Sequence, residues 1–76
     1  MPGKTATPQK RFGTVIRDER KRQTLTQEEL ASRAGISVVF LRDIERGVEN
    51  VSLETISKLA KGLETKLGEL LVRAGI

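Results

Sequence analysis

Apolar side chains recur along this chain at intervals of three and four residues, the spacing of amphipathic helices, and short polar or glycine-containing breaks separate the runs. No stretch shows the strict alternation of a half-buried strand, and no segment repeats. The pattern predicts an all-α fold, a five-helix bundle that forms one domain over residues 9–76 after a flexible arm at 1–8. The predicted helices cover about 9–22, two parts of 27–46, about 53–63, and a last segment that carries Leu67, Leu70 and Leu71.

The segment 27–46 is the most informative, because it divides into two short helices around the turn Ala34-Gly35-Ile36. Thr26 can cap the first helix with its hydroxyl, and Glu29 can reach back to the Thr26 amide, which makes a capping box. Gly35 supplies the left-handed backbone that ends this helix. Two helices joined in this way are typical of the helix-turn-helix of DNA-binding proteins.

The second helix of this motif, over residues 37–46, has two different faces. Leu41 and Ile44 fall on the inner face. The outer face carries Val39, Arg42, Asp43 and Arg46. An arginine can donate two hydrogen bonds to a guanine, a carboxylate can accept a hydrogen bond from the cytosine amino group, and a valine can pack on a thymine methyl. The outer face therefore has the chemistry to read a major groove.

The charge distribution points to the same partner. The chain has a formal net charge of +4, and residues 1–23 hold seven Lys or Arg against two acids. A basic helix taken alone is most often a solvated face. Next to a helix-turn-helix, the excess favours contact with the phosphates of double-stranded DNA.

Several function classes are excluded by what the chain lacks. Without cysteine or histidine there is no disulfide framework, no zinc finger and no catalytic triad that needs either residue. The acids are scattered without a convergent partner, so we expect no enzyme, no metal and no cofactor. No apolar run is long enough to cross a bilayer, and no signal peptide or small-molecule effector domain is recognisable. We expect a cytoplasmic protein without a membrane partner.

Over about residues 11–71 the chain resembles the lambda and 434 repressor and Cro-like family, the XRE type. The resemblance is carried by the segments FGTVIRDERKRQTLTQEELASRAGIS, FLRDIERG and NVSLETISKLAKGLE, in that order. It implies the lambda-repressor-like fold and a sequence-specific regulator of transcription. By its length the chain looks most like the stand-alone members, among them restriction-modification controller proteins and small phage or plasmid repressors. Glu19 departs from the family, which commonly has an apolar residue there.

The resemblance also implies roles for individual residues. Base contacts are expected from the start and outer face of the reading helix, at Ser37, Val38, Val39, Arg42 and Asp43. Phosphate contacts are expected from Thr26, Gln27, Arg46 and Asn50, of which Gln27 would also buttress the reading helix. An ion pair between Arg20 and Glu45, partly buried, would link the first helix to the end of the reading helix.

A homodimer is expected, because 76 residues bury only a modest core. The C-terminal segment offers more apolar surface than one small core absorbs, and we predict an interface that contains Leu67, Leu70, Leu71 and Ile76. A two-fold dimer would match a palindromic operator with half-sites about one helical turn apart. The alternative is an antitoxin-like or other protein-interaction module of this fold. The sequence leaves open the operator, the target genes, their genomic context, and whether they are activated or repressed.

Overall fold

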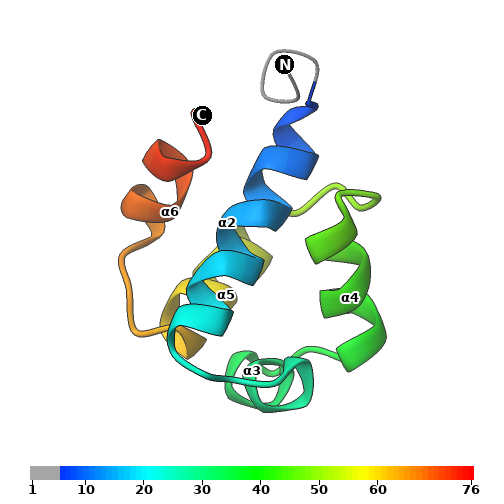
Figure 1. The fold of residues 1–76 in the computed structure, drawn as a ribbon. Helices are drawn as coiled ribbons and strands as arrows, with labels where there is room; N and C mark the ends of the chain where they lie inside the picture. The colour runs from blue at the N-terminus through cyan, green and yellow to red at the C-terminus, as the bar shows by residue number, and fades with distance from the viewer. Residues whose placement is uncertain (1–5) are drawn as a thin grey trace.

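The computed structural model describes residues 6–76, and over this range the chain forms five helices and no strand (Figure 1). They are α2 (Pro8–Arg22), α3 (Gln27–Ala34), α4 (Val38–Arg46), α5 (Leu53–Gly62) and α6 (Leu67–Arg73). The all-α fold predicted from the sequence is confirmed. No helix in this range is both long and apolar enough to cross a bilayer.

The first helix begins slightly earlier than the sequence indicated. Thr7 is its N-cap, and the Thr7 side chain accepts a hydrogen bond from the Lys10 amide. Pro8 occupies the first helical position, where its missing N–H costs nothing. Of the arm predicted at 1–8, residues 1–5 lie outside the described range, and the last residue belongs to α2.

The local signals that delimit the central helices act as expected. The Thr26 hydroxyl accepts from the Glu29 amide at 3.0 Å, and the Glu29 carboxylate accepts from the Thr26 amide at 2.8 Å, so the capping box is complete. Gly35 ends α3 with φ 71° and Gly47 ends α4 with φ 76°, both in the left-handed region. Ser52 caps α5 through the Thr55 amide. These signals fix both ends of α3, the end of α4 and the start of α5.

The core lies between all five helices, and its members come largely from the predicted apolar stripes. They are Phe12, Ile16, Leu25, Leu30, Ala31, Ala34, Leu41, Ile44, Ile56, Leu59, Ala60, Leu63, Leu70 and Ala74. Leu53 fits the apolar spacing of α5 but is 70% exposed. It is the first residue of its helix, so the stripe extends beyond the part of α5 that the core covers.

Helix α2 runs through the middle of the molecule, with α4 on one side and α6 on the other (Figure 1). The α2–α4 contact is exceptionally close at Gly13. A Cβ atom there would lie 2.3 Å from the carbonyl oxygen of Ile44 and 2.9 Å from that of Glu45. At the end of α4, a Cβ on Gly47 would lie 2.5 Å from Cγ of Lys10. The absence of a side chain at Gly13 therefore sets how near α4 comes to α2.

We predict that Gly13→Ala destabilises the fold, because the new methyl group meets backbone atoms that cannot rotate away. The expected loss in free energy of unfolding is about 1–3 kcal/mol, as for other overpacked sites. Gly68→Ala is the matched control, since a Cβ there has no neighbour within 4 Å. The control should be neutral or more stable by up to about 1 kcal/mol, from helix propensity. Urea unfolding of both variants measures this, and equal stability of the two would contradict the argument.

Candidate nucleic-acid interface

A shallow groove open to solvent lies between α2, the start of α3 and the outer side of α4. Its lining residues are Arg17, Arg20, Lys21, Gln27, Arg42, Glu45 and Arg46. Five of these seven side chains are basic, and the one acid is already paired with an arginine. The groove therefore presents net positive charge to solvent, which suits a polyanion.

The expected ion pair forms the floor of this groove. Arg20 Nε donates to Glu45 Oε2 at 2.7 Å and Arg20 Nη2 donates to Oε1 at 3.0 Å, a two-bonded arrangement. Arg20 Nη1 donates to the carbonyl of Leu25 at 2.8 Å. The side chains of Arg20 and Glu45 are only 11% and 4% exposed, and the hydrogen bonds to Glu45 raise the pKa of Arg20. The pair ties the end of α4 to α2, as the resemblance implied.

Gln27 adds a third member to this network. Its Nε2 donates to Glu45 Oε1 at 3.1 Å, so the first residue of α3 also contacts α4. This is the buttressing contact expected from the sequence. The amide group keeps a second N–H and its carbonyl oxygen for another partner. Its predicted phosphate contact remains a prediction.

The predicted base-reading residues differ in how far they reach from the fold. Val39 is 55% exposed and Arg42 is exposed, whereas Val38 is half-buried and packs against the core. The Ser37 hydroxyl caps α4 by accepting from the Phe40 amide at 3.0 Å and can still donate. Asp43 Oδ1 lies 3.6 Å from Arg46 Nη1. These side chains share the outer surface of α4 and its first turn.

The predicted phosphate contacts are not all in one place. Gln27 and Arg46 line the groove, but Asn50 does not, and it instead accepts a hydrogen bond from Gln9 Nε2. Arg17 and Lys21 line the groove and were not singled out from the sequence. Their spacing of four residues on a basic helix was the available signal, since it puts both on one face.

The C-terminal residues require a correction. Leu70 is completely buried within the single chain, so it has no surface to offer a partner and its assignment to a dimer interface is wrong. Leu67 and Leu71 are half-buried, and Ile76 is 59% exposed. Val72, which the sequence reasoning did not select, is 74% exposed on α6. The helix turns its inner face to the core, and Val72 lies on the outer face.

Comparison with known proteins gives consistent results. A family model described as helix-turn-helix matches residues 16–70. The chain is 38% identical over 64 residues to an uncharacterised HTH-type transcriptional regulator of Mycobacterium tuberculosis, a match that covers 84% of this chain and 46% of that protein. The chain thus spans about half the length of this relative.

Two smaller proteins match over more of their length. Control protein C.SmaI of Serratia marcescens is 38% identical over 61 residues, which cover 80% of this chain and 73% of that protein. The crystal structure of the restriction-modification controller protein C.AhdI from Aeromonas hydrophila superposes with a TM-score of 0.80 at 39% identity. This superposition covers 82% of the present chain and 94% of C.AhdI.

We predict that Glu45→Gln lowers the melting temperature, because it leaves the buried Arg20 guanidinium without a charged partner. The free energy of unfolding should fall by a few kcal/mol, since removing one partner of a buried ion pair leaves an uncompensated charge. Asp43→Asn is the matched control: it removes a carboxylate from the same helix, but one whose partner Arg46 is 65% exposed. The control should change the free energy of unfolding by less than about 1 kcal/mol. An unchanged melting temperature for Glu45→Gln would contradict the claim.

Proposed function

Because the chain belongs to the helix-turn-helix family, whose model matches residues 16–70, we propose that it is a sequence-specific regulator of transcription that binds double-stranded DNA. The observation that carries the proposal is the exposed outer face of α4 next to the basic groove. A protruding helix beside a positive surface matches a major groove flanked by phosphates. The relatives described above are named as regulators or control proteins, which supports a regulatory and not a catalytic role.

The proposal assigns base reading to the side chains on α4 and at its N-cap. Arg42 is free to grip guanine O6 and N7, and Val39 is exposed enough to meet a thymine methyl. Asp43 can accept from a cytosine amino group, although Arg46 competes for its carboxylate. Ser37 and Val38 complete the reading set, Val38 with the part of its side chain that the core leaves open.

Phosphate binding is proposed for the walls of the groove. Arg17 and Lys21 on α2 and Arg46 on α4 supply the charge, and Gln27 supplies an N–H at a positive helix N-terminus. Thr26 directly precedes Gln27, and Asn50 contacts Gln9 away from the groove; both remain candidates for phosphate contact. The proposal includes a location in the cytoplasm, because the relatives described above come from bacteria, whose DNA lies there.

The proposal further includes a homodimer on a palindromic operator. Val72 and Ile76 are largely exposed apolar side chains, and Leu67 and Leu71 border them. A two-fold axis through this surface would present two reading helices to successive turns of the major groove. An antitoxin-like module would use the same apolar surface for a different protein, and self-association in the absence of any partner distinguishes the two.

We expect operator affinity to fall steeply with salt, because bound phosphates release counterions. Arg17→Ala combined with Lys21→Ala should reduce the slope of log affinity against log salt by about 2 per subunit, roughly 0.9 for each lost contact. Lys61→Ala combined with Lys66→Ala removes the same charge from exposed residues outside the groove and should leave the slope unchanged. Fluorescence anisotropy on an operator selected from random DNA measures it. If the operator affinity of the parent protein does not depend on salt concentration, the proposed phosphate contacts are wrong.

Reading of bases is tested by repeating the operator selection with Arg42→Ala and Asp43→Ala. Each should relax the preference at one position, by about 1–3 kcal/mol of discrimination. Asp43→Ala should also strengthen non-specific binding, because it removes a negative charge near phosphates. Arg46→Ala is the comparison variant and should weaken all sequences alike. If both substitutions leave the preferred sequence unchanged, α4 does not read DNA through these residues.

The dimer is tested with Val72→Asp, which places a charge on the outer face of α6. Sedimentation should show a dimer for the parent protein at tens of micromolar and a monomer for this variant, since a buried unpaired carboxylate opposes association. Val48→Asp makes the same change at a 58% exposed valine in the loop after α4 and should remain dimeric. A parent protein that stays monomeric with and without DNA refutes the dimer.

A further inference from the structure

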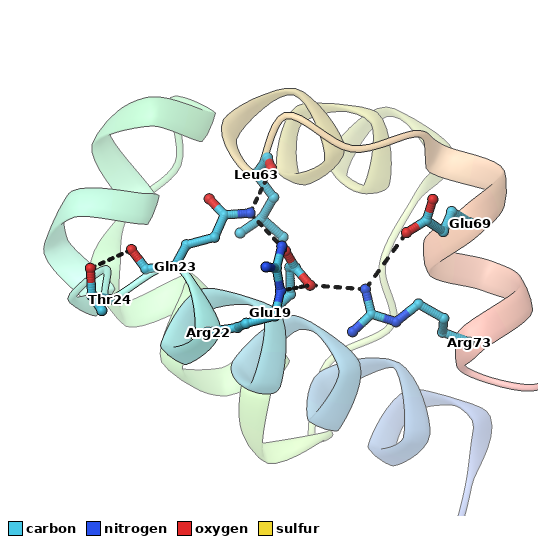
Figure 2. Close-up of polar contacts among 7 residues, drawn as sticks. All are labelled: Glu19, Arg22, Gln23, Thr24, Leu63, Glu69 and Arg73. Carbon is cyan, nitrogen blue, oxygen red and sulfur yellow. Dashed lines mark hydrogen bonds and ion pairs between the residues drawn. The ribbon is translucent and has the colours of Figure 1, made fainter.

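Two adjacent residues of α2 form ion pairs with helices on opposite sides of the molecule. Arg20 pairs with Glu45 at the end of the reading helix α4. Glu19 pairs with Arg73 on α6, where Arg73 Nη1 lies 3.0 Å from Glu19 Oε1 (Figure 2). One turn of α2 therefore connects the helix proposed to read DNA with the helix proposed to mediate dimerisation.

The Glu19 carboxylate is buried and fully engaged. Its side chain is only 4% exposed, and it accepts hydrogen bonds from Arg22 and Arg73 and from Gln23 Nε2 at 2.8 Å (Figure 2). Gln23 Nε2 also donates to the carbonyl of Leu63 at 2.8 Å, which ties in the end of α5. The hydrogen bonds from Arg22 are the largest cause that lowers the pKa of Glu19, to about 2. The carboxylate is thus ionised at any pH near neutrality and holds its donors as an anion.

Helix α6 has few other directional attachments. It is seven residues long and has no side-chain cap at its N-terminus. Leu70 and Ala74 anchor it in the core. The polar contacts that join it to α2 are Arg73 with Glu19, and Arg11 Nε with the carbonyl of Ala74 at 2.9 Å. Hydrogen bonds depend strongly on angle, so these contacts add a directional constraint to the apolar packing of the helix.

We propose that Glu19 and Arg73 are positioning residues that set the angle of α6 relative to α4, and through it the half-site spacing that the dimer accepts. This inference rests on the proposed dimeric, DNA-binding function. Arg73 directly follows the exposed Val72, so the ion pair acts on the part of α6 that would meet the second subunit. In a two-fold dimer, both subunits contribute the same change in the angle of α6 to the geometry of the dimer. A small rotation therefore displaces the two reading helices relative to each other by twice its effect.

Two substitutions each remove one guanidinium from Glu19, in one case from α6 and in the other from α2 itself. Arg73→Met deletes the guanidinium that crosses from α6 and keeps most of the aliphatic stem for packing. Arg22→Met deletes the guanidinium that Glu19 receives from its own helix, at a side chain that is 70% exposed. The second variant is the matched control, because it changes the Glu19 environment without releasing α6.

The experiment measures affinity for operators that carry the same half-sites with the spacing changed by one or two base pairs, and for DNA with a single half-site. The parent protein should prefer one spacing. The preference ratio is the affinity for the preferred spacing divided by the affinity for an altered spacing. Arg73→Met should reduce this ratio by about fivefold or more, which is the lower end of coupling between linked sites. Its affinity for the single half-site should stay within about twofold of that of the parent protein. Arg22→Met should keep the parent ratio.

A second variant covers the case in which Arg73→Met simply unfolds α6. Glu19→Asp keeps the charge and shortens its side chain by one methylene, so the contact to Arg73 must shift or break, and the preferred spacing should weaken or move. A spacing preference that Arg73→Met and Glu19→Asp both retain, or that Arg22→Met loses equally, overturns the inference. A parent protein that selects no DNA sequence or does not dimerise instead refutes the proposed function, and with it this extension.

Discussion

The close contact between α2 and α4 at Gly13 is the constraint on which the rest of the structure depends. Because that position has no side chain, α2 approaches to within contact of the carbonyls of Ile44 and Glu45. At this distance the Arg20 guanidinium reaches Glu45 with two hydrogen bonds. Helix α4 is therefore held by a backbone contact at one point and by an angle-dependent ion pair at another. Together with the apolar packing, these two points fix the direction of α4.

The same ion pair shapes the electrostatics of the groove. Glu45 would otherwise place a negative charge where DNA phosphates are proposed to lie, but Arg20 and Gln27 take up its oxygens inside the fold. The remaining side chains of the groove then leave it positive. A buried pair of this kind adds little net stability compared with apolar packing, and fixing one arrangement of the helices is its better-attested use. Glu19 with Arg73 repeats the device on the other side of α2.

Glu19, which departs from the family pattern, has a physical consequence for the attachment of α6. An apolar residue at position 19 would join the core without direction, whereas the carboxylate present here requires donors from α2 and α6 and is ionised. An apolar residue at this position would leave α6 without the ion pair that Glu19 forms with Arg73. Differences of this type can alter the geometry of an assembly while each subunit keeps the same fold.

The sequence by itself determined the helices, the caps of α3, α4 and α5 and the faces of α4, because a cap or a left-handed glycine acts within about four residues of itself. Together with the family resemblance it also identified the Arg20–Glu45 pair, which the structure contains. Only the tertiary structure decided that Leu70 is core and Leu53 is exposed, and that Arg17 and Lys21 border the reading helix. It alone showed the need for glycine at position 13 and the burial of Glu19. These features depend on which helices pack together and at what distance, and residues far apart in the chain set that distance.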